Sequence, residues 1–176
     1  HIIPHGIDMK LFRPVEGIQR TGSRVLFTNA WGKKEIKGYK HWEWIKKHLP
    51  KEIECEEILG GTPLEDMPKI YSSADLTLFL SLWEETFGLT VIESLACGTP
   101  VISYPVGIST TEIHNWSNGF ISMDCNPQTV VHEIIRFWEL DPERKKEMRD
   151  HCRSNVEKKF SAEREAQDYV DLAKKI

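Results

Sequence analysis

Two short apolar runs, residues 76–80 and 101–104, flank a stretch that predicts a tight loop followed by a helix over residues 89–97. Gly88 stands where this helix is expected to begin, and Gly98 where it is expected to end. This order makes a βαβ unit: a strand, a loop, a helix that ends at a glycine, and a second strand parallel to the first. The start of the helix therefore lies at the carboxyl edge of a sheet, where unpaired N–H groups and the helix dipole attract an anion, usually phosphate.

The remainder of the chain also alternates between predicted strands and helices. This order indicates an α/β fold, a Rossmann-like, doubly wound and mostly parallel sheet with helices on both faces. Ligands bind beyond the carboxyl ends of such strands, so the loops that follow them are expected to line one crevice. The further predicted strands are 25–29, 53–59 and 119–123, and the further predicted helices are 39–49, one from 62, one from 126, 141–160 and one from 161.

Capping residues predict where several of these helices begin. Thr62 and Glu65 form a capping box, and Pro63 suits the first turn. On the last helix, Tyr169 and Val170 are expected to face inward. The other predicted helix starts are at Asn126, Asp141 and Ser161.

Length and composition narrow the class of protein. A chain of 176 residues with 40% hydrophobic content can bury one core, so residues 1–176 are expected to form one domain. The net charge of −4 argues against a nucleic-acid binder that works by bulk electrostatics. Four scattered cysteines without a C-x-x-C pair favour a cytoplasmic protein with reduced thiols. Because the chain begins without Met in an extended stretch, residues 1–20 are expected to be a linker within a longer protein.

Two glutamates, eight positions apart, flank the predicted anion site. Glu85 lies in the loop, and Glu93 lies on a narrow polar strip of the helix among small hydroxyl and thiol residues. Carboxylates in these places can accept hydrogen bonds from the hydroxyls of a sugar phosphate. Simpler interpretations remain open. Glu93 could belong to an ordinary polar helix face that happens to lack lysine, and either Glu84 or Glu85 could be a solvent-exposed charge in the turn. Gly88 could be an anion nest or a plain helix start.

A cluster of lysines follows the first predicted strand. A cation that neutralises a diphosphate would belong in this loop, although most charge runs are solvated and only one or two of the four are expected to contact a ligand. The sequence has no His or Cys residues at a spacing typical of metal ligands on one element, so no metal site is expected. It also contains no P-loop and no nucleophile elbow. The lysines are Lys33, Lys34, Lys37 and Lys40.

Seven segments, spread over almost the whole chain, follow one known pattern. In chain order they are PHGIDMKLFRP (4–14), KG (37–38), YSSADLTLFLS (71–81), EETFGLTVIESLACGTPVI (84–102), VG…TEI (106–113), NGF (118–120) and KFSAER (159–164). With these segments the chain resembles the C-terminal, donor-binding half of GT-B-fold retaining glycosyltransferases, in particular family 4, the glycosyl transferases group 1.

The resemblance implies a role for each matching residue. Glu85 would contact the donor sugar near the reacting carbon, Glu93 would bind the ribose hydroxyls, and Lys37 would neutralise the diphosphate. The base would lie near Gly60 and Gly61. The turn that would meet the sugar and phosphates comprises Thr86, Phe87, Gly88, Leu89 and Thr90.

The chain departs from the family's pattern in two places. The family usually has Gly-Arg after the first strand, whereas this chain has Asn29-Ala30-Trp31, so either Lys33 or Lys34 substitutes for the arginine or the diphosphate is bound more weakly. Between Lys37 and Tyr71 the sequence predicts one strand where the family has two. The sheet is therefore expected to be one βα unit short, on the side where the base would bind.

The resemblance implies metal-independent, cofactor-free transfer of a hexose from a UDP-, GDP- or ADP-sugar, with retention of configuration. The acceptor, a glycan, a lipid or another molecule, would bind an N-terminal domain outside this chain, without which little transfer is expected. The whole protein would be cytoplasmic, with peripheral association at the cytoplasmic face of the membrane as a further expectation. The alternatives are a non-catalytic module that binds sugar nucleotides, a glycosidase that uses Glu85 and Glu93 as its acid and base, and a GT-B-fold epimerase.

Overall fold

The computed structural model of the chain describes residues 1–28 and 34–175. Its centre is a five-stranded parallel sheet in the order β2-β1-β3-β4-β5. Each strand lies within two residues of its predicted bounds, and the doubly wound α/β prediction is confirmed. The strands are β1 (Arg24–Thr28), β2 (Glu54–Ile58), β3 (Leu76–Phe79), β4 (Val101–Ser103) and β5 (Gly119–Ile121).

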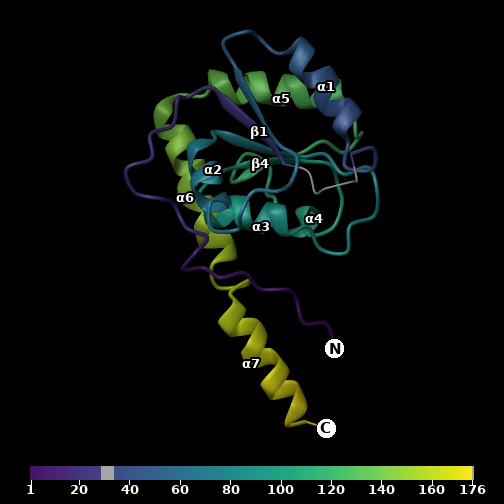
Figure 1. The fold of residues 1–176 in the computed structure, drawn as a ribbon, viewed down its shortest axis with the longest axis vertical. Helices are drawn as coiled ribbons and strands as arrows, with labels where there is room; N and C mark the ends of the chain where they lie inside the picture. The colour runs from purple at the N-terminus through teal and green to yellow at the C-terminus, as the bar shows by residue number, and fades with distance from the viewer. Residues whose placement is uncertain (29–33, 176) are drawn as a thin grey trace.

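Helices cover both faces of the sheet (Figure 1). On one face α1 packs against α5, and on the other α3 packs against α2 and α6. The helices are α1 (Tyr39–His48), α2 (Met67–Ser73), α3 (Leu89–Ala96), α4 (Ser109–Glu112), α5 (Pro127–Glu139), α6 (Pro142–Val156) and α7 (Ala162–Ala173).

The central strands are apolar on both sides because each contributes to two cores. In β1, Leu26 belongs to the core under α3, whereas Val25 and Phe27 belong to the core under α1 and α5. Alternate side chains of a strand point to opposite faces, so a strand covered by helices on both faces is apolar along its whole length. The two layers of helices therefore account for the nearly continuous apolar runs in the sequence.

Strand β2 is the exposed edge of the sheet next to β1, and its sequence differs from that of the central strands. It carries Glu54, Glu56 and Glu57, and none of its residues is fully buried. Charged side chains on an edge strand discourage other chains from pairing with it. It is the one strand between Lys37 and Tyr71 in the described part of the chain, as the sequence predicts.

Three of the four predicted helix starts are confirmed by side-chain caps, at Asn126, Asp141 and Ser161. The prediction at Thr62 is wrong, because α2 begins five residues later, at Met67. A helix that began at Thr62 would place Pro68 in its interior, where proline has no N–H to donate. Instead Pro68 occupies the first turn of α2, where this N–H is not needed.

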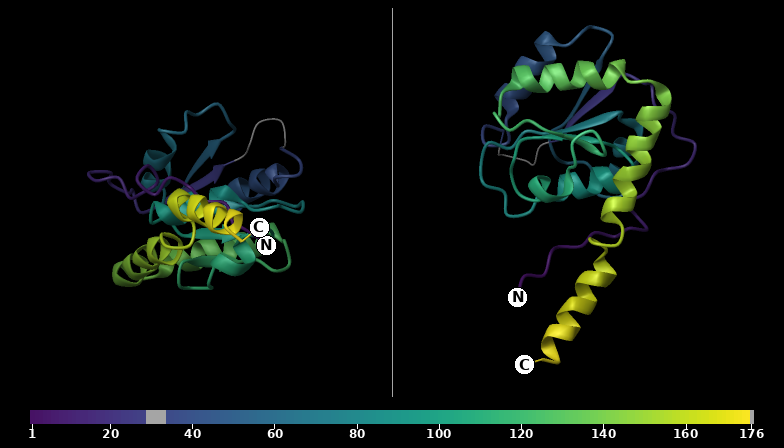
Figure 2. Two further views of the ribbon diagram at one scale, coloured as in Figure 1. Left: turned by 90° about the horizontal axis from the view of Figure 1, so that it is seen from below. Right: turned by 180° about the vertical axis from the view of Figure 1, so that it is seen from behind.

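Helix α7 projects away from the rest of the molecule, as Figure 1 and the right-hand view of Figure 2 show. Its start is joined to the N-terminal segment, because Ile7 N donates to Phe160 O at 2.8 Å and Ala162 N donates to Ile7 O at 3.0 Å. The prediction that Tyr169 and Val170 face inward is wrong: they are 54% and 48% exposed. The helix has an apolar side, but no other element of the described chain packs against it there.

Candidate functional site

The turn before α3 lies at the carboxyl edge of the sheet, as the sequence predicts. Gly88 is its N-cap, with φ at 103° and no side-chain cap. A Cβ atom on Gly88 would come within 3.2 Å of the Phe79 ring, so glycine suits both the conformation and the space. Among the residues that the structure describes, the N–H groups of Leu89 and Thr90 meet no acceptor. They are available to an anionic ligand.

The loop after β4 supports this turn from one side. Ile108 N donates to Phe87 O at 2.6 Å. A Cβ on Gly107 would lie 2.3 Å from the same oxygen, so only glycine allows this close approach. The aromatic ring of Phe87 also packs edge-on against His5 at 5.4 Å and against Phe160 at 5.8 Å between centroids. The turn is thus held by the loop after β4, by the N-terminal segment and by the segment between α6 and α7.

The structure brings Lys37 and Glu85 together. Their side chains form an ion pair and are only 19% and 17% exposed. Ser81 Oγ also donates to Glu85 Oε1, at 2.9 Å. The contact is possible because the loop before α1 lies against the end of β3: Leu82 N donates to Ile36 O at 2.8 Å. The predicted cation of the diphosphate site therefore neutralises the predicted sugar-binding carboxylate.

Glu93 lies one turn into α3 and has a different environment. Its Oε2 accepts a hydrogen bond from the phenol of Tyr71 at 2.9 Å. Burial raises the pKa of Glu93 above its usual value, and the bond from Tyr71 opposes this shift. Burial and the neighbouring carboxylate raise the pKa of Tyr71 as well, so the phenol keeps its proton and acts as a donor.

A cavity of about 180 Å³ lies beside Glu93, between the ends of β1 and β2 and the starts of α2 and α3. It joins Gly60, Thr90 and Glu93, which were all predicted as ligand contacts. Glu93 is the one charged side chain among its lining residues in the described chain. The buried Oγ1 of Thr28 meets no partner among the described residues. The full lining is Thr28, Ile58, Gly60, Thr62, Met67, Tyr71, Thr90 and Glu93.

Sequence reasoning did not single out Tyr71 or Thr28 as site residues. Tyr71 is the first residue of the matching segment 71–81, and its side chain is 1% exposed. A buried phenol usually has a hydrogen-bond partner. A tyrosine in a predicted core could therefore have indicated a polar partner nearby. No comparable signal marks Thr28, whose position at the end of β1 alone brings it to the cavity.

Not all predicted residues gather at the site. The ammonium of Lys34 lies over the Tyr39 ring, 4.6 Å from its centroid. Thr86 is exposed beside Glu85, and Gly61 follows Gly60 without lining the cavity. Lys33 and Asn29-Ala30-Trp31 lie outside the described residues.

A larger hollow, of about 420 Å³, lies between the N-terminal segment and α2. Lys10, Arg13 and Lys69 line it together with Glu16 and Glu65, so its charges largely compensate one another. It contains none of the predicted site residues. Within residues 1–28 and 34–175, no group of three or more His, Cys, Asp or Glu side chains could hold a metal ion, and no helix is both long and apolar enough to cross a membrane.

Known proteins match this chain in sequence and in fold. Trehalose synthase of Pyrococcus horikoshii is 25% identical over 153 residues, which are 86% of this chain and 36% of that protein. Anabaena Alr3699/HepE, solved with UDP and glucose, superposes with a TM-score of 0.82 at 15% identity, over 100% of this chain and 57% of its own. The C-terminal domain of LpcC from Francisella tularensis superposes with a TM-score of 0.70 at 17% identity, over 89% of this chain and 100% of its own.

The chain thus spans about a third of the length of that trehalose synthase and about half of HepE, and the structural likenesses, at these identities, concern the fold alone. The sequence model of one family, described as Glycosyl transferases group 1, matches residues 44–159, which include Glu85, the turn at Gly88 and Glu93. The chain therefore belongs to the glycosyl transferases group 1 family and has the Rossmann-like architecture of one half of a GT-B glycosyltransferase.

Proposed function

We propose that this chain is the domain of a glycosyltransferase that binds a nucleotide-diphosphate sugar. The diphosphate lies against the free N–H groups of Leu89 and Thr90, with Lys37 as its cation. The ribose bonds to Glu93, and the base occupies the neighbouring cavity at Gly60. HepE, which has the same fold, has been solved with UDP and glucose, which supports a donor of this class.

One observation carries this proposal: a turn whose Leu89 and Thr90 amides meet no acceptor in the described chain lies between two carboxylates in unlike environments. The side of the turn toward Glu93 opens into a cavity whose other lining residues are uncharged, which suits a nucleoside. The side toward Glu85 carries the ion pair with Lys37, which suits a sugar joined to a phosphate. A ligand with phosphates at its centre and hydroxyls at both ends complements this order of groups.

The reaction is a transfer of a hexose to a glycan, lipid or other acceptor, with retention of configuration and without a metal. Donor binding separates Lys37 from Glu85, because the diphosphate competes for the ammonium. Lys37 and the N-terminus of α3 then stabilise the charge that develops on the departing diphosphate. Glu85, released from its cation, accepts hydrogen bonds from the sugar and supports positive character at the anomeric carbon.

The other parts of the whole enzyme are inferred from the family. The acceptor binds a second domain, and residues 1–20 are the linker to it. The protein works in the cytoplasm, with peripheral association at the cytoplasmic face of the membrane. No cofactor takes part, and the substrate is a UDP-, GDP- or ADP-hexose.

Calorimetric titration of the protein with UDP-, GDP- and ADP-glucose tests donor binding. We expect one of the three to bind, and Glu93→Ala to weaken its binding about tenfold or more, the loss of a hydrogen bond to a charged group. Glu84→Ala is the matched control, since Glu84 is exposed and lies one position before Glu85. Equal effects of the two substitutions, or no binding by any of the three donors, would contradict the proposal.

A non-catalytic module that binds sugar nucleotides is the second candidate. The absence of Gly-Arg after the first strand favours it, because the family's arginine grips the diphosphate. Glu85→Gln in the intact protein distinguishes the two candidates. If the protein is an enzyme, this variant binds donor but loses transfer; a wild type that binds donor and transfers nothing to any acceptor would support the module.

A further inference from the structure

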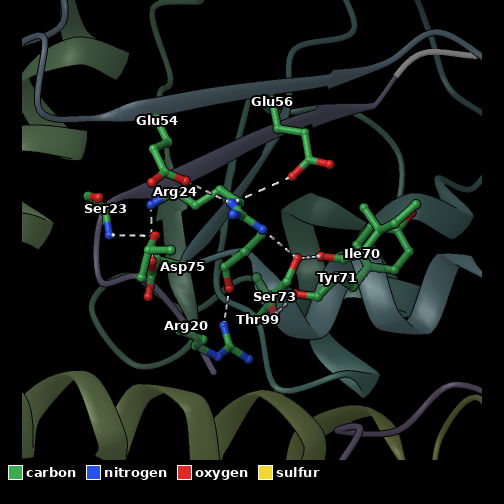
Figure 3. Close-up of polar contacts among 12 residues, drawn as sticks. Arg20, Ser23, Arg24, Glu54, Glu56, Ile70, Tyr71, Ser73, Asp75 and Thr99 are labelled. Carbon is green, nitrogen blue, oxygen red and sulfur yellow. Dashed lines mark hydrogen bonds and ion pairs between the residues drawn. The ribbon is translucent and has the colours of Figure 1, made fainter. Parts of the chain in front are cut away.

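Tyr71 is fixed at both of its ends. Its ring is buried in the core near Phe12, with 6.4 Å between the ring centroids. Its carbonyl accepts a hydrogen bond from Thr99 Oγ1 at 2.6 Å, at the opposite edge of the sheet (Figure 3). Its phenol reaches the wall of the cavity and donates to Glu93 Oε2. A side chain held in this way presents its hydroxyl at one fixed point.

The hydroxyl of Tyr71 is the main polar contact of the Glu93 carboxylate. In the part of the chain that the structure describes, no ammonium or guanidinium bonds to Glu93, and its Oε1 makes no hydrogen bond. The groups that face it are Tyr71 from α2, Thr28 from β1, Thr90 from its own helix, and Cys97, whose pKa burial and Glu93 raise to about 12. The thiol is therefore neutral at physiological pH, and the phenol is the one side-chain donor that the structure places on the carboxylate.

We propose that Tyr71 is a positioning residue for nucleoside recognition: its phenol holds one oxygen of Glu93, so that the other oxygen accepts hydrogen bonds from a ribose diol. This inference rests on the proposed function. It makes the cavity selective for ribonucleotides, because a deoxyribose cannot supply both hydroxyls. A purely structural Tyr71 would fill the same volume, and its hydroxyl would have no effect on which sugar is bound.

Tyr71→Phe removes the hydroxyl and keeps the ring. We expect it to weaken the binding of whichever of UDP, GDP and ADP binds the wild type about tenfold, the effect of a lost hydrogen bond to a charged group. Its effect on the corresponding 2′-deoxynucleoside diphosphate should be smaller, so that the preference for ribose falls. Tyr104→Phe is the matched control: Tyr104 is also fully buried, and its phenol bonds to His41 Nδ1 at 2.7 Å rather than to Glu93.

The pH profile of binding separates positioning from packing. Glu93 must be ionised to accept from the ribose, and the bond from Tyr71 lowers its pKa. In Tyr71→Phe the pKa of Glu93 rises further, so the loss of binding on acidification should begin at a higher pH than in the wild type. The profile of Tyr104→Phe should match that of the wild type.

The outcomes distinguish this inference from the proposed function. If the wild type binds none of the three nucleotides, the proposed function fails and Tyr71 has no ligand to position. If the wild type binds one and Tyr71→Phe keeps its affinity, ribose preference and pH profile, the proposed function stands and this inference is overturned. Should Tyr71→Phe unfold, Tyr71→Met provides the same test, because it also places an apolar side chain without a donor beside Glu93. It should lower the ribose preference and move the loss of binding on acidification to a higher pH; a variant that keeps the wild-type preference and pH profile overturns the inference.

Discussion

At the amino edge of the sheet, Arg24 and Asp75 each bond to more than one neighbouring group, whereas at the carboxyl edge two amides at the start of α3 meet no acceptor among the described residues. Arg24 bonds to Glu54 and Ser73, each at 3.1 Å, as Figure 3 shows. Asp75, 1% exposed, accepts from the Arg24 amide at 3.0 Å and from Arg149 at 2.8 Å. At the carboxyl edge, Gly88 has φ at 103°, a conformation that only glycine tolerates well.

The difference shows how one sheet separates stability from function. Polar groups that satisfy one another stabilise the fold and are not available to a ligand. In the described part of the chain, amides without an acceptor, a buried carboxylate without a cation and a glycine turn contribute little to stability, but they suit the proposed binding site. Substitutions at the amino edge should therefore lower the free energy of unfolding, and those at the carboxyl edge should mainly lower binding or transfer.

The largest effect is expected at the amino edge. Asp75→Ala leaves the Arg149 guanidinium without its partner, and we expect it to lower the free energy of unfolding by about 3 kcal/mol, as for other broken buried ion pairs. Urea unfolding measures this loss. Glu54→Ala, which breaks the more exposed pair with Arg24, should cost less than about 1 kcal/mol. Nucleotide affinity of folded Asp75→Ala should equal that of the wild type; a large loss of affinity would break the comparison.

Lys37→Met should have the largest functional effect. It removes the proposed cation of the departing diphosphate, and we expect transfer by the intact enzyme to fall about 100- to 1000-fold, as when one preorganised donor is removed from an active site. Steady-state kinetics with the donor measure this loss. Lys47→Met, at an exposed position near the end of α1, is the control. Equal losses in both variants would mean that Lys37 acts only through overall charge.

Gly88→Ala tests the turn itself. Its φ of 103° is unfavourable for alanine, and we expect a loss of about 1–2 kcal/mol of stability in thermal unfolding. Gly22→Ala is the control, because Gly22 has φ at 83° and open space around its Cβ position. Both variants should lose similar stability, but only Gly88→Ala should weaken nucleotide binding, since it displaces the amides of Leu89 and Thr90. Unchanged binding would remove the turn from the site.

The smallest effect is expected from Glu93→Gln, which should raise the free energy of unfolding in a pH-dependent way. Because its folded pKa lies above the usual 4.5, the folded state binds more protons than the unfolded state, and wild-type stability falls as pH rises from about 4.5 through the raised pKa. Glu93→Gln lacks this fall and should be more stable than the wild type at pH 7. Chemical unfolding at several pH values measures it. A variant that is less stable at pH 7 would show that Glu93 contributes to the fold.

Local features of the sequence predicted much of the fold. Asn126, Asp141 and Ser161 cap helices because their side chains bond to amides two or three residues along the same chain. The predictions failed where distant structure or a competing residue decided. No helix begins at Thr62, because Pro68 would then lie inside it. Helix α7 has an apolar side, but no element of the described chain covers it.

In the candidate site, too, the sequence predicted the positions of neighbouring residues but not the contacts between distant ones. The spacing of Glu85 and Glu93 around Gly88 placed two carboxylates beside a helix N-terminus, since residues so close in sequence are positioned by one loop and one helix turn. The partners of those carboxylates lie far away in the chain: Lys37 is 48 residues from Glu85, and Tyr71 is 22 residues from Glu93. No periodicity or cap encodes such distances.

The sequence by itself determined the alternation of strands and helices, the glycine turn and the family, because these depend on short-range backbone preferences and on residue order. Only the tertiary structure decided that Lys37 neutralises Glu85 while Tyr71 holds Glu93. Those pairings arise where separate elements meet at the carboxyl edge of one sheet, and the packing of its two cores brings them together.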